Sequence, residues 1–325
     1  MVALRKPRAL PPGGTIGIAA PASAVDAERL AAGEARWRKA GFRTLRRDDL
    51  LSRHRYLAGD DARRASELAE LWADPRVDAI VCARGGYGCH RIMDRLDPRA
   101  ARVAAKPLVG YSDITTLLLW QRRCAGLVGL HGPMLERGDE IGDDEFEALV
   151  AALTGSERLP LVRAGREGAG GVVEGPLVGG SLAMAAASLG TPWQIEARGA
   201  ILLLEDVGER PYQIDRLLQQ LRCAGVTDGV AGVGLGHFER CDEPERSEGD
   251  KRARGRAEGE PADAAITAEA VLREWLDELG VPWVAGLPFG HGAPNLAWPM
   301  GVRARLDGAG AELHILESGV AAAAR

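Results

Sequence analysis

The alternation of short apolar runs with amphipathic helical stretches over residues 15–120 constrains the fold more than any other feature of the chain. Apolar runs ending in small or polar residues occupy 15–23, 77–88 and 107–113. Helical spacing of apolar residues marks 26–41 and 59–75. Continuously apolar strands that alternate with helices predict a parallel sheet covered on both faces, and hence a doubly wound α/β domain.

The second half of the chain mixes strands and helices without this clean alternation. A buried strand is predicted at 200–206, a helix opens at Pro211, and a terminal hairpin turns at Asp307-Gly308. Residues 156–175 are rich in glycine and charge and carry little periodicity. We therefore predict a first domain at 1–155, a linker at 156–175 and a second domain at 176–325.

The segment 240–260 is densely charged with both signs and contains almost no apolar residues. Such a segment buries too little surface to offset the entropy lost on ordering, so it is predicted to be a solvated, mobile loop. A lid over a ligand site is one role for it, but a tolerated insertion is the favoured interpretation.

Charge and cysteine content narrow the class of partner. The net charge of −5 provides no basic field for phosphate backbones, so nucleic acid is not expected as a partner, and peptides or small molecules are. Five dispersed cysteines without a C-x-x-C pair predict neither a disulfide framework nor a zinc site, and indicate a cytoplasmic protein. The apolar patch TIGIAA is too short for a signal peptide, and no stretch has the ~20 apolar residues of a membrane span.

Ser112 lies where a strand pattern passes directly into a helix pattern, in GYSD. A nucleophile elbow has this form, with an exposed hydroxyl and the next backbone N–H aimed at a developing oxyanion. The second glycine of G-x-S-x-G is missing, however, and serine is also a favoured helix N-cap. This pattern alone does not decide whether Ser112 is a nucleophile or a helix N-cap.

The loop RGGYG, with Gly85 and Gly86, follows a neighbouring predicted strand. Consecutive glycines there can offer backbone N–H groups to an oxyanion or a phosphate, although a plain tight turn is an equal alternative. The loop has neither the Walker nor the dinucleotide-binding spacing. The carboxyl ends of parallel strands share one edge of a sheet, so we expect this loop to lie near Ser112.

A serine nucleophile needs a base and usually an acid that orients the base. Among six histidines, His291 lies between two glycines after a predicted strand, and His237 is its rival. Glu205 follows four apolar residues of a predicted buried strand, where a carboxylate needs a partner. Asp206 and Glu209 are alternatives to Glu205, and a structural role is open for each of these residues.

Taken in series, ARGGYG, KPLVGYSDIT, LLLEDVGERPYQIDRLLQQL and GLPFGHGAPN…PMG resemble the LD-carboxypeptidase family of serine peptidases. This family includes murein tetrapeptide carboxypeptidases and microcin C immunity proteins, and the similarity runs from Gly14 to Gly301. The resemblance implies a Rossmann-like N-terminal domain, a smaller β-rich α/β C-terminal domain, and an active site in the cleft between them.

The resemblance also implies roles for single residues. Ser112 is then the nucleophile, His291 the general base and Glu205 its orienting acid. Backbone N–H groups of Asp113 and Gly86 form the oxyanion hole. No metal or cofactor is implied, and a homodimer is expected.

Gly85 and Ser181 are the predicted substrate-binding residues, and the chain departs from the family at the second of them. The family commonly has Gly-Gly-Asn-Leu where this chain has Gly179-Gly180-Ser181-Leu182. The expected activity is release of terminal D-alanine from a murein tetrapeptide. Alternatives are an immunity-type amidase for aminoacyl-nucleotides, with Trp193 or Trp298 stacking on the base, and a non-catalytic binder of murein fragments or nucleotides.

Overall fold

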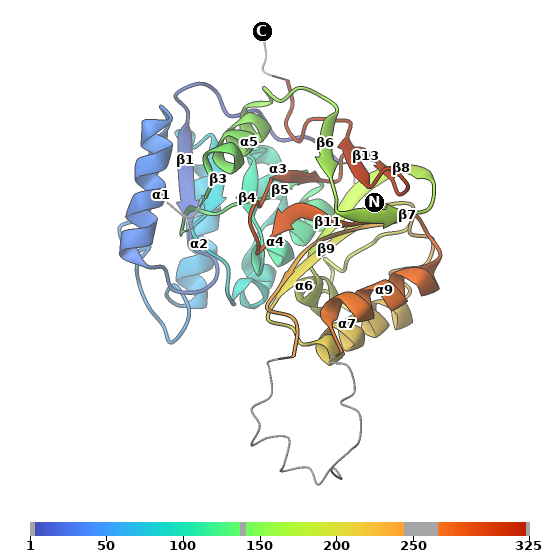
Figure 1. Ribbon diagram of the computed structural model, residues 1–325. Helices are drawn as coiled ribbons and strands as arrows, with labels where there is room; N and C mark the ends of the chain where they lie inside the picture. Colours follow the sequence, from blue (N-terminus) through green and yellow to red (C-terminus); the bar gives the residue numbers. More distant parts are fainter. Residues whose placement is uncertain (1–3, 137–140, 244–265, 323–325) are drawn as a thin grey trace.

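The computed structural model describes residues 4–136, 141–243 and 266–322, and it contains two sheets (Figure 1). Most of the segment 240–260, predicted to be a mobile loop, lies outside the described residues. Mixed α/β architecture with parallel strands in both sheets agrees with the fold class predicted from the sequence.

The first sheet has the strand order β12-β5-β4-β3-β1-β2, and only β12 is antiparallel to its neighbour. Its strands are β1 (Thr15–Ala19), β2 (Arg43–Leu45), β3 (Ala79–Cys82), β4 (Leu108–Gly110), β5 (Gly129–His131) and β12 (Trp298–Met300). The associated helices are α1 (Ala27–Lys39), α2 (Asp61–Ala73), α3 (Pro98–Ala104), α4 (Ile114–Trp120) and α5 (Asp143–Thr154). Short helical turns are η1 (Cys89–Arg91), η2 (Met93–Arg95) and η3 (Gln121–Ala125).

The second sheet has the order β6-β14-β13-β8-β9-β10-β11-β7, in which β8 to β11 run parallel. Its strands are β6 (Leu161–Ala164), β7 (Glu167–Ala169), β8 (Val172–Ser181), β9 (Ile201–Val207), β10 (Gly232–Glu239), β11 (Trp283–Gly290), β13 (Arg303–Asp307) and β14 (Glu312–Ile315). Helices α6 (Leu182–Ala187), α7 (Pro211–Cys223) and α9 (Ala268–Leu279) follow β8, β9 and β10 in the chain. They lie together beside the parallel strands (Figure 1).

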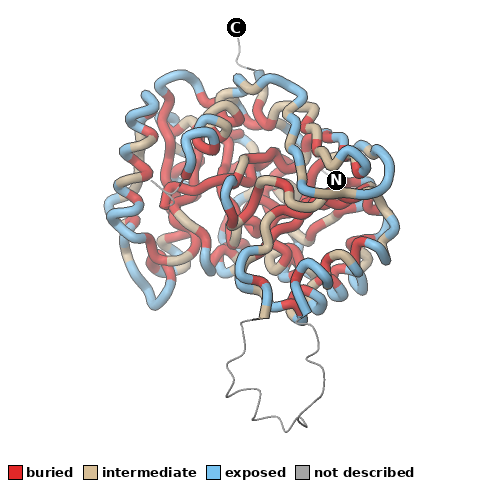
Figure 2. Tube along the Cα trace, in the orientation of Figure 1, coloured by how far each residue is buried: buried red, intermediate tan, exposed pale blue. Residues whose placement is uncertain are grey.

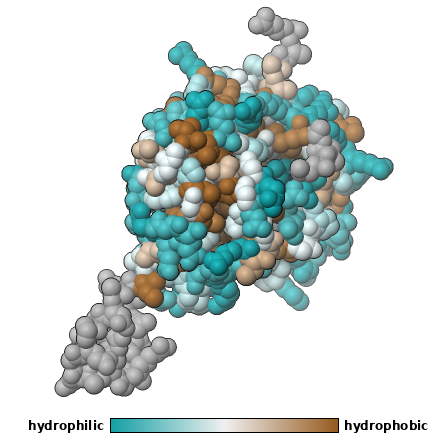
Figure 3. Space-filling model, turned by 90° about the vertical axis from the view of Figure 1, so that its right-hand side faces the viewer, coloured by the Kyte–Doolittle hydropathy of each residue, from teal (hydrophilic) through white to brown (hydrophobic). Residues whose placement is uncertain are grey.

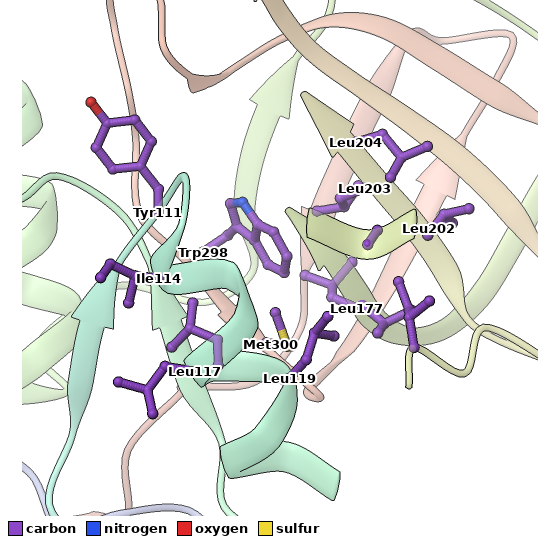
Figure 4. Packing of buried hydrophobic residues seen from close by; sticks show 14 of the residues in the cluster. Tyr111, Ile114, Leu117, Leu119, Leu177, Leu202, Leu203, Leu204, Trp298 and Met300 are labelled. Carbon is purple, nitrogen blue, oxygen red and sulfur yellow. The ribbon is translucent and has the colours of Figure 1, made fainter. Parts of the chain in front are cut away.

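One apolar core joins the two halves of the chain. Side chains of α4 face those of β8, β9 and β12 in Figure 4, and all belong to one buried cluster. Both sheets are buried along their centres, whereas the outer surfaces of the helices are exposed (Figure 2). The face shown in Figure 3 is mostly hydrophilic with a few hydrophobic patches. This shared core fixes the two sheets against each other and therefore fixes any site between them.

The division into domains at 1–155 and 176–325 stays a prediction, but two details of it need correction. The predicted linker 156–175 holds β6, β7 and the start of β8, which are part of the second sheet. Residues 298–300 return to the first sheet as β12 and pair with β5. Edge strands this short and partly exposed produce little hydrophobic periodicity, which explains why the sequence pattern did not indicate them.

Candidate active site

Ser112 lies on a strained turn between β4 and α4. Its φ is +61°, in the left-handed region that serine rarely adopts. The N-cap of α4 is Asp113, and no side chain caps the helix. The half-buried hydroxyl of Ser112 is therefore not a helix cap, and the strain is of the kind that gathers at functional sites.

The glycine loop after β3 lies directly against Ser112. A Cβ placed on Gly85 would come 2.9 Å from Ser112 Cβ and 3.3 Å from the backbone N of Asp113. Gly86 has a φ of +101°, and a Cβ there would collide with Ser23 Oγ. Only glycine fits at either position, so the predicted neighbourhood of loop and serine is confirmed in space.

Two side chains hold the loop in place. Ser23 Oγ accepts from the Tyr87 N–H at 3.1 Å, and buried Asp113 Oδ2 accepts from the Cys89 N–H at 2.9 Å. The sequence did not single out Ser23 for this role, although its place after the first predicted strand puts it on the same sheet edge. Asp113 thus links the turn of Ser112 to the loop that faces it.

The backbone N–H groups of Asp113 and Gly86 have no protein acceptor among the residues that the structure describes. Gly86 is exposed and directly follows Gly85, the residue that lies against Ser112. Two unused donors beside a half-buried hydroxyl have the composition of an oxyanion hole.

Glu205 and His291 form a close pair in the second half of the chain. Glu205 Oε2 lies 2.7 Å from His291 Nδ1, Glu205 is wholly buried, and the His291 side chain is 16% exposed. Glu205 belongs to β9 and His291 follows β11, and Gly290 between them has a φ of +108°. A Cβ on Gly290 would lie 2.7 Å from Glu205 Oε2, so this glycine allows the imidazole to approach the carboxylate.

The charge of Glu205 depends on its imidazole neighbours. Burial by itself raises the pKa of this carboxyl group, but contacts with His131 and His291 outweigh burial and lower it to about 2. Glu205 is therefore an ionised acceptor at neutral pH, which holds the proton of His291 on Nδ1 and leaves Nε2 free to act as a base.

His131 is the second imidazole at Glu205, and the sequence did not single it out. It ends β5, is wholly buried, and its Nε2 lies 3.6 Å from Glu205 Oε1. The available signal was its place after a parallel strand, on the sheet edge that also carries Ser112.

The two halves of the site meet at Tyr111. Its ring, next to Ser112 in the chain, packs edge-on against His291 with ring centroids 4.9 Å apart. Within the described residues, no hydrogen bond joins Ser112 Oγ to His291. Catalytic hydrogen bonds are often long without substrate and tighten in its complex, so this spacing is compatible with a nucleophile and its base.

Ser181 is buried and its hydroxyl serves the fold. Its Oγ accepts from the Met184 N–H at the start of α6 and donates to Asp206 Oδ2, both at 3.3 Å. Its own N–H donates to Thr115 Oγ1 at 3.2 Å, across the two halves. The hydroxyl of this predicted substrate-binding residue is thus engaged within the fold, where it orients α6 and Asp206.

The remaining candidates lie around this centre. His237 Nε2 is 3.1 Å from the Pro294 carbonyl oxygen, so it supports the loop after His291. Trp298 is buried and stacked on His131, whereas half-buried Trp193 packs edge-on against His90. Trp298 is therefore not available to stack on a nucleobase.

No group of three or more histidine, cysteine, aspartate or glutamate side chains within 4–136, 141–243 and 266–322 is arranged to hold a metal ion. No helix in these ranges has the length and apolar character needed to cross a membrane.

Two family models match successive parts of this chain. The model of the LD-carboxypeptidase N-terminal domain matches residues 16–132, and that of the C-terminal domain matches residues 174–306. A Bacillus subtilis protein named "probable murein peptide carboxypeptidase" is 35% identical over 326 residues, covering 97% of this chain and 95% of its own.

Two further relatives represent both branches of the expected function. The crystal structure of a muramoyltetrapeptide carboxypeptidase from Oxalobacter formigenes superposes with a TM-score of 0.79 at 29% identity, covering 93% of this chain and 99% of that one. The microcin C7 self-immunity protein MccF of Escherichia coli is 27% identical over 91% of each chain. Both domain models match this chain, and the B. subtilis relative is 35% identical over nearly the full length. The chain therefore belongs to the LD-carboxypeptidase family.

Proposed function

We propose that the protein is a serine LD-carboxypeptidase that releases terminal D-alanine from a murein tetrapeptide by a Ser112-His291-Glu205 triad. The observation that carries the proposal is the 2.7 Å contact between buried Glu205 and His291, at a site faced by the strained Ser112 turn. An ionised carboxylate that fixes an imidazole beside a serine hydroxyl is the arrangement that activates serine.

In the acylation step, His291 Nε2 accepts the Ser112 hydroxyl proton as Oγ attacks the carbonyl carbon before the terminal D-alanine. The carbonyl π bond breaks, and its electron pair becomes the oxyanion of the tetrahedral intermediate. Glu205 stabilises the imidazolium that forms, because its pKa of about 2 keeps it charged.

The oxyanion accepts hydrogen bonds from the unused N–H groups of Asp113 and Gly86. Because Asp113 also binds the loop through Cys89, one residue holds both donors in register. Loss of a single oxyanion donor costs about 10²–10³-fold in turnover in other serine hydrolases.

Collapse of the intermediate breaks the C–N bond, and the imidazolium gives its proton to the leaving amine of D-alanine. A water molecule, deprotonated by His291, then attacks the acyl-enzyme and releases the shortened peptide. The bond changes balance with water as the sole co-reactant.

Murein peptide is favoured over an aminoacyl-nucleotide as the substrate class. The B. subtilis and O. formigenes relatives carry murein-peptide names at 35% and 29% identity, against 27% for the immunity protein. Trp298, one of two aromatic candidates for base stacking, is buried against His131.

A cytoplasmic homodimer is part of the proposal. Its support is the resemblance to the family, together with five cysteines that are all free, as expected in a reducing compartment. Light scattering of purified protein tests the oligomeric state.

Ser112→Ala tests the triad. We expect D-alanine release from the tetrapeptide, followed by mass spectrometry, to fall about 10³–10⁶-fold without loss of thermal stability. Ser156→Ala removes the same oxygen from an exposed serine and is the matched control. More than a few per cent of residual activity would reject the nucleophile.

Substrate class is tested in parallel with tetrapeptide, tripeptide, a D,D-linked peptide and an aminoacyl sulfamoyl adenosine. We expect only the tetrapeptide to be cut. Turnover of the adenosine compound alone would favour the immunity-type activity, and tight binding without turnover or labelling by a serine-directed fluorophosphonate would favour a binder.

A further inference from the structure

We propose that His131 is a positioning residue, which donates its Nε2–H to Glu205 Oε1 and so leaves Glu205 Oε2 to hold His291. This inference rests on the proposed triad and adds a fourth side chain to it. It explains a histidine that no other feature of the site uses.

The carboxylate of Glu205 has one imidazole at each oxygen. Oε2 is 2.7 Å from His291 Nδ1, and Oε1 is 3.6 Å from His131 Nε2. A normal hydrogen bond is about 2.7–3.2 Å long, so the second contact is not yet closed in the substrate-free protein. Tightening on substrate binding is the usual behaviour of such contacts.

Glu205 Oε1 and the His131 ring have no other hydrogen-bond partner among the described residues. Glu205 Oε1 and both ring nitrogens of His131 are buried without a hydrogen bond to any described residue. A buried polar atom without a hydrogen-bond partner destabilises the fold, and the imidazole and the carboxylate reduce this cost by meeting each other. The tautomer with the proton on Nε2 directs the donor of His131 to the open oxygen.

The His131 ring is held in a fixed orientation by aromatic neighbours. Trp298 stacks on it with centroids 5.0 Å apart, and Phe289 and Tyr111 pack against it at 5.9 Å. Trp298 is also its direct partner in the β5–β12 pairing. A ring locked by packing is a good support for a catalytic carboxylate, since little entropy is lost when the contact closes.

The titratable groups that face Glu205 are His131, His291 and, beside it in the chain, Asp206. Removing the His131 donor leaves the carboxylate with more charge to direct at His291. The imidazolium then holds its proton more strongly, so its action as a base needs a higher pH.

His131→Phe and His131→Gln test the donor. Phenylalanine keeps the stack on Trp298 without an N–H, whereas glutamine keeps an N–H donor. We expect His131→Phe to slow labelling of Ser112 by a fluorophosphonate about 10–100-fold, the usual effect of losing an orienting partner, and to move the acidic limb of its pH profile upward. His131→Gln should recover most of the rate.

His314→Gln is the matched control, because His314 Nε2 contacts Glu312 Oε2 at 2.8 Å in the terminal hairpin, outside the site. If Ser112→Ala abolishes labelling while His131→Phe leaves both rate and pH profile unchanged, the triad stands and the role of His131 is rejected. If Ser112→Ala still labels, the proposed function fails first.

Imidazole ¹⁵N NMR of the unaltered protein keeps the proposal testable should His131→Phe not fold. The His131 signal, assigned with His131→Gln, should show a proton on Nε2. A neutral ring protonated on Nδ1 alone would overturn the proposal.

Discussion

Glu205 and Asp206 are neighbouring carboxylates on β9, both buried, yet their acidities move in opposite directions. The pKa of Glu205 falls from 4.5 to about 2, whereas that of Asp206 rises from 3.8 to about 7. Successive residues of a strand point to opposite faces of the sheet, so the two groups have different surroundings.

Partners make the difference, because burial raises the pKa of both groups. Glu205 faces two imidazoles, which favour its charged form. Asp206 accepts from the N–H groups of Ala183 and Val207 and from the Ser181 hydroxyl, but it also feels the charge of Glu205. Neutral donors do not offset burial and a like charge as imidazoles do.

The pH dependence of stability therefore has opposite signs at the two positions. Glu205 contributes stability above about pH 4.5 that is lost as the pH falls toward 2. Asp206 contributes stability below about pH 3.8 that is lost as the pH rises through about 7, since the folded protein holds this proton more tightly.

Of the changes at the two carboxylates, Glu205→Gln should produce the larger effect on activity. An amide at this position no longer fixes the tautomer of His291, and the equivalent change in another serine triad lowers turnover about 10⁴-fold. D-alanine release is the measurement, and Asp206→Asn, the same change one residue away, is the control. Similar losses in both variants would show that the two carboxylates are not functionally distinct.

Asp206→Asn should remove a pH-dependent loss of stability. At pH 4 the carboxyl group is neutral in the folded protein and still about half neutral in the unfolded one, so the free energies of unfolding of wild type and variant should be close. Between pH 4 and 7 the wild-type protein loses about 1.4 kcal/mol per pH unit from this group, and the variant does not. Urea unfolding at pH 4 and pH 8 should therefore show the variant more stable at pH 8, and parallel pH dependences would contradict the raised pKa.

The fold was predictable where the hydrophobic pattern is continuous. Ile16, Ile18 and Val81 lie in wholly or almost wholly buried parallel strands, and the helices between those strands were marked by their spacing. The return of Trp298–Met300 to the first sheet was not predictable, because three residues around a proline carry no period and pair with residues far away in the chain.

The place of the candidate site was predictable up to the direction of its side chains. Ser112 and His291 follow buried strands and Glu205 lies near the carboxyl end of one, where ligands bind in parallel sheets. The residues alone did not separate Glu205 from Asp206, since which face of β9 meets the imidazoles depends on tertiary packing, and the family resemblance made that choice. His131 was missed because its partner comes from the other sheet.

Ser181→Ala should produce the smallest effect, and its pH dependence sharpens the contrast between the carboxylates. The change removes the N-cap of α6, worth about 1 kcal/mol, and also a donor to Asp206. The donor matters most when Asp206 is ionised, so the loss of unfolding free energy should be larger at pH 8 than at pH 5.

Thr267→Ala is the matched control for Ser181→Ala. Thr267 caps α9 by accepting from the Ala270 N–H at 3.1 Å. Its loss should cost a similar amount at both pH values, because no buried carboxylate depends on that hydroxyl. Equal pH dependence in the two variants would mean that the Ser181 hydroxyl stabilises the start of α6 alone, and that Asp206 is held by its backbone donors.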